Sequence, residues 1–219
     1  MTVLSETPQS PTLRLAILIL AAGEGSRLGG YPKGLLKKDG NSLLKHFIHS
    51  VKSLSPVEML AVTGFYSEEI EAEIQSIQKS VQNTHSLITS VRNPNPEAGQ
   101  SSSVRLGLES LQSDYDVLLI VLCDQPNVGA SEIEVLLNQF HQRTPHQEII
   151  LPMVNGQRGN PVLFSKAVIQ SVLAIPGMVC RPYMDQHPEL VKTVASNNQA
   201  YLQDVDRQAD IQNLGLDRI

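Results

Sequence analysis

A glycine-rich loop follows the first apolar run of the sequence and holds the residues best suited to bind phosphate. The apolar run Leu15–Leu20 ends in a stretch of small side chains, and Arg27 and Lys33 follow soon after. Small side chains let backbone N–H groups approach a polyanion closely, and the two cations add charge. This pattern predicts a nucleoside triphosphate site, whose loop residues are Leu20, Ala21, Ala22, Gly23, Glu24, Gly25 and Ser26.

Two well-known phosphate-binding motifs do not fit this loop. The dinucleotide fingerprint G-x-G-x-x-G matches at Gly23 and Gly25, but Leu28 stands at its third glycine. Leu28 also occupies the second glycine position of the P-loop motif G-x-x-x-x-G-K-[ST]. An ordinary strand-to-helix turn is the alternative interpretation, because glycine-rich turns are common.

Asp124 is the carboxylate best placed to bind a metal ion. It comes two residues after the apolar run Val117–Leu122, at the predicted mouth of a buried strand. Mg²⁺ is commonly held by one or two carboxylates together with phosphate oxygens and water. Asp204 and Asp206 precede the last predicted helix, and Asp206 is our candidate for a second ligand. The alternative is that all three carboxylates serve in turns or helix caps.

Two further polar segments are candidates for substrate contacts. Gly99, Gln100, Ser101 and Ser103 open a predicted helix, where free N–H groups and hydroxyls are able to bind phosphate or a base edge, although serine capping alone is the alternative. Arg158, Gly159 and Asn160 lie between two predicted strands and are expected to contact a phosphorylated acceptor, unless they form a bare hairpin. Arg105 is expected to pair with Glu109 one turn along the helix.

Composition narrows the class of protein. The chain of 219 residues is 41% hydrophobic and 18% charged, which suits one α/β domain over residues 14–219 behind a loose tail at 1–13. A net charge of −5 argues against nonspecific nucleic-acid binding. The spacing of Cys123 and Cys180 indicates neither a disulfide framework nor a zinc site. Without a signal peptide or a membrane-spanning run, we expect a soluble cytoplasmic protein.

Strand-like and helix-like segments alternate along the chain. Strands are predicted at 15–20, 59–63, 86–91, 117–122, 149–153, 162–164 and 191–194, and helices at 43–51, 67–77, 101–111, 131–140, 167–173, 182–186 and 206–214. This order predicts a three-layer α/β/α fold with a mostly parallel, Rossmann-like sheet. Ligands bind at the carboxyl ends of such strands, so the loops after the first, third and fourth strands are expected to form one site.

The same motifs carry a family resemblance. The chain resembles the MobA-like nucleotidyltransferases, and most closely the molybdenum cofactor cytidylyltransferases, over about 15–211. The matching segments are Leu20–Gly23 with Arg27–Gly29, Lys33, Gly99–Ser103, Cys123–Pro126, Arg158–Phe164 and Asp204–Asp206. The resemblance implies that the first loop binds the triphosphate, that Arg27 and Lys33 neutralise it, and that Asp124 binds Mg²⁺. It further implies CTP as donor, a molybdopterin-type acceptor near Arg158, and a molybdoenzyme or its chaperone as a possible partner.

The chain departs from the family pattern on the acceptor side. Asn160 stands where the family often has histidine, and Pro176–Arg181 keeps the family's arginine but loses its acidic residue. The last segment, Asp204–Asp210, also lacks the usual Thr-Pro-Glu. These differences leave two alternatives open. One is the same chemistry with GTP or with a sugar phosphate, and the other is a non-catalytic protein that binds and delivers the cofactor.

Overall fold

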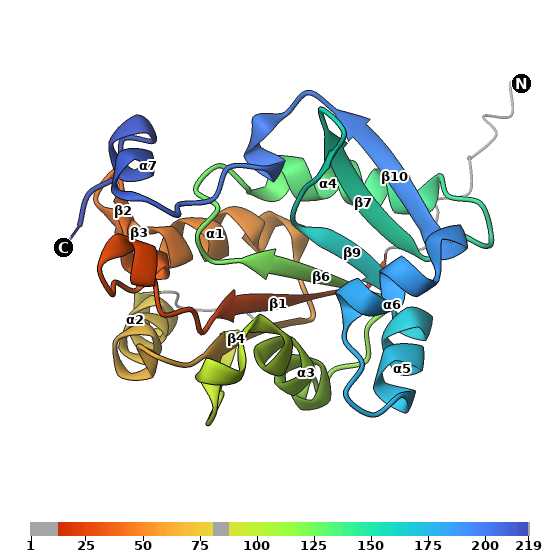
Figure 1. The fold of residues 1–219 in the computed structure, drawn as a ribbon, viewed down its shortest axis with the longest axis horizontal. Coiled ribbons are helices and arrows are strands. Elements are labelled where there is room, and N and C mark those ends of the chain that lie inside the picture. The colour runs from red at the N-terminus through yellow and green to blue at the C-terminus, as the bar shows by residue number, and fades with distance from the viewer. Residues whose placement is uncertain (1–12, 81–87, 219) are drawn as a thin grey trace, which may run out of the picture.

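The fold is built on one eight-stranded sheet, seen in a computed structural model that describes residues 13–80 and 88–218 (Figure 1). The strands run in the order β10-β7-β9-β6-β1-β4-β5, and β8 pairs with β7. Their bounds are β1 Leu15–Ala21, β4 Glu58–Thr63, β5 Ile88–Arg92, β6 Val117–Leu122, β7 Ile149–Val154, β8 Gln157–Arg158, β9 Val162–Ser165 and β10 Val191–Ser196.

The sheet is mostly parallel, as the sequence predicts. β1 pairs in parallel with β4 and β6, β4 with β5, and β10 with β7, whereas β9 runs antiparallel to both β6 and β7. All seven residues of β1 are buried, which is typical of a central strand covered on both faces. The arrowheads of β1 and β6 point towards the same side of the molecule (Figure 1). The loops after these strands therefore meet at one edge.

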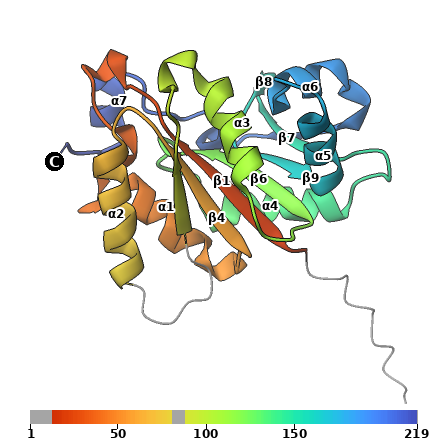
Figure 2. The same ribbon diagram turned by 90° about the horizontal axis from the view of Figure 1, so that it is seen from below.

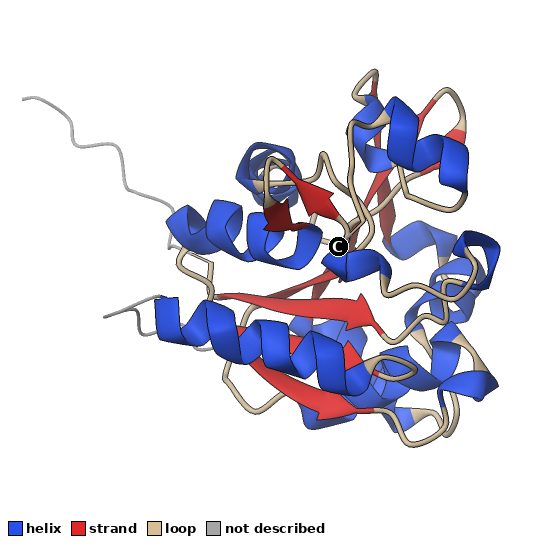
Figure 3. Cartoon of the chain, turned by 90° about the vertical axis from the view of Figure 1, so that its left-hand side faces the viewer, coloured by secondary structure: helices blue, strands red, loops and turns tan. Residues whose placement is uncertain are grey.

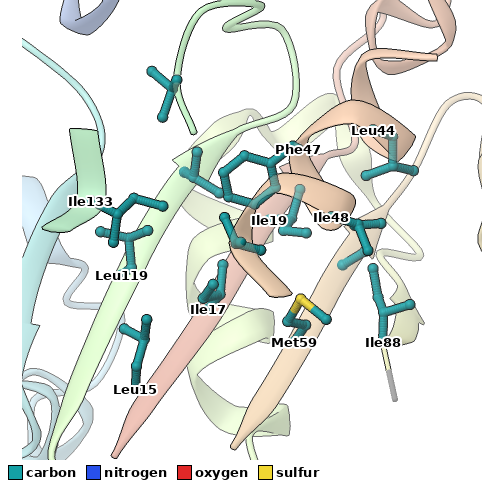
Figure 4. Close-up of a cluster of buried hydrophobic side chains, with 14 of the residues drawn as sticks. Leu15, Ile17, Ile19, Leu44, Phe47, Ile48, Met59, Ile88, Leu119 and Ile133 are labelled. Atoms are coloured by element: carbon teal, nitrogen blue, oxygen red, sulfur yellow. The ribbon is translucent and has the colours of Figure 1, made fainter. Parts of the chain in front are cut away.

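Helices cover both faces of the sheet and complete the three layers (Figure 2). On one face lie α1 Leu43–Val51, α2 Ser67–Ser80 and α4 Ala130–His141, and on the other lie α3 Gln100–Ser110, α5 Lys166–Ala174 and α6 Cys180–Gln186. An apolar core lies on each face of the sheet, and alternate residues of β1 point into the two cores. Ile17 and Ile19 lie on the α1 side and Leu18 lies on the α3 side. Figure 4 shows Phe47 and Ile48 of α1 packed over Ile17 and Ile19.

A third, smaller apolar cluster joins the C-terminal segment to the residues that follow the glycine loop. Leu28, Leu36 and Leu43 pack with Val205, Ile211 and Leu216. Two short strands, β2 Lys37–Lys38 and β3 Asn41–Ser42, form a hairpin that the sequence analysis missed, and Lys37 bridges to Asp217 beside it. The hairpin and the C-terminal segment lie on the side that faces the viewer in Figure 3.

The predicted helices and strands are confirmed, with shifted ends. The helix expected over 67–77 extends to Ser80 as α2, and the helix expected over 206–214 is the shorter α7, Gln208–Asn213. The expected tail at 1–13, except Leu13, and the first two residues of the strand predicted at 86–91 lie outside the described residues. Cys123 and Cys180 are free thiols. Among the described helices, none has the length and apolar character needed to cross a membrane.

Helix α3 approaches the sheet closely because Gly107 has no side chain. A Cβ atom built at Gly107 would lie 2.5 Å from Leu18 Cδ1 and 3.0 Å from Val62 Cγ2. Both neighbours are fully buried or nearly so, and they have little room to move. Gly107 therefore fixes the height of α3 above β1 and β4, and with it the position of the Gly99–Ser103 segment.

Replacing Gly107 with valine is expected to destabilise the protein by about 2 kcal/mol or more, because the added methyl groups overpack the contact with Leu18 and Val62. The measurement is the free energy of unfolding from urea denaturation. Ser110→Ala serves as the control in the same helix, since the Ser110 hydroxyl bonds only to the carbonyl of Leu106 among its described contacts. Equal stabilities for the two variants would contradict the packing role of Gly107.

Candidate functional site

A cavity of about 700 Å³ opens at the carboxyl ends of β1, β4 and β6. It collects the glycine loop after β1, the segment 96–103 around the start of α3, and Asp124 just beyond β6. The loops after the first, third and fourth predicted strands therefore line one cavity, as expected. The predicted residues that line the cavity are Leu20, Ala21, Ala22, Gly23, Glu24, Gly25, Ser26, Arg27, Lys33, Gly99, Gln100, Ser103, Asp124 and Asp206.

The glycine loop is held in shape by its own backbone and by one tyrosine. Gly25 adopts a left-handed φ of 64°, and a Cβ there would lie 2.2 Å from the carbonyl oxygen of Tyr31, so only glycine fits. The following residues, Ser26–Leu28, form a short 3₁₀ turn. The Tyr66 hydroxyl, at the start of α2, donates to the carbonyl oxygen of Glu24 at 3.0 Å. The loop is thus preorganised before a ligand arrives.

The predicted catalytic cations and metal ligands form one cluster of ion pairs. Lys33 Nζ lies 2.9 Å from Asp124 Oδ2 and 2.6 Å from Asp206 Oδ1. Arg27 Nη1 lies 2.7 Å from Asp206 Oδ2. The side chains of Lys33 and Asp124 are only 18% and 14% exposed, whereas Arg27 is largely exposed. Lys33 and Asp124 therefore interact largely out of solvent, where electrostatic interactions are strong.

These contacts shift the pKa values of the three inner groups. Burial raises the pKa of Asp124, although the Lys33 ammonium acts in the opposite direction. Burial also opposes the charge on Lys33, but Asp124 and Asp206 outweigh it and raise the pKa of the amine. The hydrogen bond from Lys33 lowers the pKa of Asp206. Lys33 therefore stays protonated, and its charge holds the carboxylates together.

The carboxylates suit a divalent metal that also binds phosphate. Asp124 Oδ1 is buried and has no hydrogen-bond partner among the described residues, which leaves a lone pair directed at no protein donor. No group of three or more His, Cys, Asp or Glu side chains in the described part of the chain forms a complete cage for a metal. Two carboxylates supplemented by phosphate oxygens and water are the ligand set typical of Mg²⁺. Asp124 and Asp206 fit that set.

The structure places Asp206, rather than Asp204, beside Lys33. The buried side chain of Val205 packs in the small apolar cluster, and its N–H donates to the carbonyl oxygen of Asp124 at 3.1 Å. Val205 therefore anchors the segment that carries both aspartates next to Asp124. The Asp206 N–H also donates to Asp210 of α7. Asp206 reaches Lys33, while Asp204 is exposed.

No serine side chain caps the start of α3. Gly99 is the N-cap residue and makes no side-chain capping bond. Ser102 instead donates to the carbonyl oxygen of Gly99 at 2.8 Å, and Asn93 Nδ2 donates to the hydroxyls of Ser102 and Ser103. The alternative interpretation, plain serine capping of this helix, is therefore not what the structure shows. The expected Arg105–Glu109 pair is present.

A second, smaller cavity of about 240 Å³ adjoins the first, and Leu20, Gln100 and Leu122 line both. The predicted acceptor residues Arg158, Gly159 and Asn160 lie here, together with Ser101, which does not line the first cavity. The other lining side chains are mostly apolar, namely Val104, Ile120, Leu151, Val162, Phe164, Val179, Cys180 and Met184, and Arg181 completes the rim.

Two arginines, the partly buried Arg105 and the exposed Arg158, brace the walls of the second cavity. Arg105 donates to the carbonyl oxygens of Leu173 and Ile175 at the end of α5, at 3.1 and 3.0 Å, and so supports the connection to α6. Arg158 forms an ion pair with Asp185 of α6. Burial raises the pKa of Cys180 to about 12, as it does for Cys123 in the first cavity, so both remain neutral thiols.

Several lining residues escaped the sequence analysis. Phe65, Pro96 and Glu97 line the first cavity, and Phe65 is an exposed aromatic residue. Phe65 follows β4, whose carboxyl end lies at the same edge as that of β1. The rule used for the other strand ends would have indicated it. The contact of Pro96 with Gly64 depends on the tertiary packing, since a Cβ on Gly64 would lie 2.9 Å from Pro96 Cβ.

Comparisons with known proteins agree with this architecture. The bifunctional protein GlmU of Mycobacterium ulcerans is 29% identical over 138 residues, which cover 62% of this chain and 27% of GlmU. This chain thus spans about a quarter of that relative. Among solved structures, Rv0371c from Mycobacterium tuberculosis has a TM-score of 0.69 at 20% identity, covering 92% of this chain and 97% of Rv0371c. Rv0371c has also been solved in complex with manganese.

A second solved structure with the same fold is 4-diphosphocytidyl-2C-methyl-D-erythritol synthase from Anaerococcus prevotii. Its TM-score is 0.69 at 16% identity, covering 92% of this chain and 94% of the synthase. The family model for the MobA-like NTP transferase domain matches residues 17–189, which include the glycine loop, Asp124 and the acceptor segment. With most of its length covered by that model, the chain belongs to the MobA-like NTP transferase family of nucleotidyltransferases.

Proposed function

We propose that the protein transfers CMP from CTP to a phosphorylated molybdopterin-type acceptor and releases pyrophosphate. The observation that carries the proposal is the pair of adjoining cavities. One is lined by the glycine loop and the Lys33–Asp124–Asp206 cluster, and the other by the Arg158 segment. A donor and an acceptor placed in the two cavities meet at the shared residues Leu20, Gln100 and Leu122. Holding both reactants in one geometry supplies a large part of the catalysis in such a transfer.

In this reaction, an oxygen of the acceptor phosphate attacks the α-phosphorus of the nucleotide, and the bond to the β-phosphate bridging oxygen breaks. A phosphate monoester is already nucleophilic at neutral pH, so the chain does not have to supply a general base. The glycine loop binds the triphosphate through its N–H groups. Lys33 and Arg27 bind its oxygens and neutralise charge that builds up on the departing pyrophosphate.

Asp124 and Asp206 are the proposed ligands of a divalent cation, Mg²⁺ in our proposal. When bound, the metal neutralises phosphate charge and helps align the triphosphate for attack. The unpartnered Asp124 Oδ1 supports this role. The manganese complex of Rv0371c, a protein of the same fold, is also consistent with a divalent cation in this chain.

The second cavity suits a compound with flat apolar faces, polar edges and an anionic group. Most of its lining is apolar, while Arg158, Arg181 and Asn160 supply polar groups. The faces of a pterin would pack against the apolar lining, and the polar atoms at its edges would need partners among these three residues. The lining is in this way consistent with a molybdopterin-type acceptor. The resulting dinucleotide would then pass to a molybdoenzyme or its chaperone.

The choice of CTP rests on the family resemblance, and ligand-induced stabilisation tests it. With Mg²⁺ present, CTP is expected to raise the melting temperature of the protein more than GTP, UTP or ATP does, because a ligand that binds only the native state stabilises it by mass action. CTP without Mg²⁺ is expected to give a smaller shift. Stronger stabilisation by GTP would assign GTP as the donor. Stabilisation by the pterin alone would favour a non-catalytic carrier.

Asp124→Asn is expected to lower kcat by roughly 100-fold or more, since it removes the inner carboxylate from the phosphate site. The assay measures pyrophosphate release from CTP, Mg²⁺ and the molybdopterin acceptor. Asp204→Asn is the matched control, two residues from Asp206 in the same segment but exposed, and it is expected to retain near wild-type activity. Full activity of Asp124→Asn would refute the proposed role of that residue.

Arg158→Gln is expected to raise KM for the acceptor by about tenfold with little change in KM for CTP, because Arg158 lines only the second cavity. Steady-state kinetics with each substrate varied in turn give the two constants. Arg207→Gln, an exposed arginine outside both cavities, controls for the loss of one positive charge. If Arg158→Gln instead raised KM for CTP alone, the assignment of the two cavities would have to be reversed.

A further inference from the structure

The cations of the first cavity are already engaged by the protein's own carboxylates. Lys33 contacts both Asp124 and Asp206, and Arg27 contacts Asp206. Among the described residues that line the cavity, no other side chain carries a positive charge that could bind a triphosphate. Arg27 is largely exposed and keeps N–H donors for phosphate, whereas the poorly exposed Lys33 cannot turn towards phosphate without leaving a carboxylate behind.

The charge balance of the cavity is also unfavourable for a bare triphosphate. Its charged lining side chains are two cations, Arg27 and Lys33, and four carboxylates, Glu24, Glu97, Asp124 and Asp206. If Lys33 turned towards the nucleotide, the poorly exposed Asp124 would lose its ion-pair partner beside a polyanion. Removing one partner of such an ion pair is costly, because the remaining charge is neither solvated nor compensated.

A divalent cation that binds without a nucleotide is repelled by the Lys33 ammonium. The Lys33 ammonium contacts Asp124 Oδ2 and Asp206 Oδ1, one oxygen of each carboxylate that is proposed to hold the metal, and leaves only Asp124 Oδ1 unpartnered on Asp124. A metal entering while Lys33 stays in place would face a positive charge within a few ångströms, which is a strong repulsion at low solvent exposure. Lys33 can turn away at low cost only if another anion accepts it.

We propose that Lys33 is an internal counter-ion that occupies the cation position between Asp124 and Asp206 in the empty site. The divalent cation and the nucleotide then bind interdependently. The metal replaces Lys33 on the carboxylates, and Lys33 moves to the phosphates. This inference rests on the proposed function for the identity of the nucleotide, but its account of Lys33 and the metal can be tested without one.

Removing the Lys33 side chain is expected to strengthen metal binding. Lys33→Met in the full-length chain is expected to bind Mn²⁺ about tenfold more tightly than wild type without nucleotide, within the range usual for coupling between sites. Isothermal titration and the electron paramagnetic resonance signal of free Mn²⁺ measure the affinity. The same variant is expected to bind CTP more weakly, and CTP and Mn²⁺ are expected to lose most of their mutual enhancement.

Two variants control this experiment. Lys45→Met makes the same change in net charge on α1, at a residue that does not line either cavity, and is expected to bind Mn²⁺ as wild type does. Adding Asp124→Asn to Lys33→Met is expected to abolish the gain, which locates the ion between the carboxylates. A gain that persisted in the double variant would place the metal elsewhere and overturn the inference.

Mn²⁺ affinity of Lys33→Met equal to or weaker than that of wild type would also overturn it. If melting curves showed that Lys33→Met does not fold, wild type still decides the question. CTP should tighten Mn²⁺ binding, and Mn²⁺ should tighten CTP binding by the same factor, because coupling is reciprocal. Independent binding of the two would contradict the proposal. Failure of every NTP to bind would refute the proposed function, while leaving the nucleotide-free Mn²⁺ comparison intact.

Discussion

The contact of one ammonium group with two carboxylates organises the functional end of this molecule. Lys33, which follows the glycine loop, joins Asp124, which follows β6, to Asp206, which precedes α7. These residues are far apart in the chain, and each would be costly to bury alone. Their mutual pairing allows these charged groups to lie, largely out of solvent, at the carboxyl ends of the apolar strands. A nucleotide and a metal would have to rearrange that same pairing.

The rest of the fold serves to bring these charges together at one edge. Parallel pairing of β1 with β4 and β6 places three carboxyl ends side by side, and two apolar cores hold the helices against both faces. Close approach at Gly107 sets the height of α3, whose first residues separate the two cavities. Arg105 extends this support to the connection between α5 and α6. The positions of the two cavities are thus fixed by one continuous scaffold.

Much of this arrangement was predictable because it follows from local rules. Continuous apolar runs such as Val117–Leu122 indicate strands buried on both faces, and their alternation with helical patterns implies parallel pairing. The strand-end rule then places Asp124 and the glycine loop together. Other features depend on contacts distant in sequence. The β2–β3 hairpin is too short to show periodicity. Asn93, from the loop after β5, donates to the hydroxyls of Ser102 and Ser103 in a contact that no local pattern indicates.

By itself, the sequence determined the order of elements, the place of the glycine loop after the first strand and the set of candidate charged residues, because these depend on side-chain type and short-range periodicity. Only the tertiary structure decided that Asp206 and not Asp204 reaches Lys33, that Ser101 faces the second cavity, and that Phe65 lines the first. The physical reason is that packing sets where a side chain points. Val205 anchors the segment beside Asp124, and ion pairs with Lys33 and Arg27 hold the Asp206 side chain in the site. No pattern within the segment 204–206 could reveal those long-range contacts.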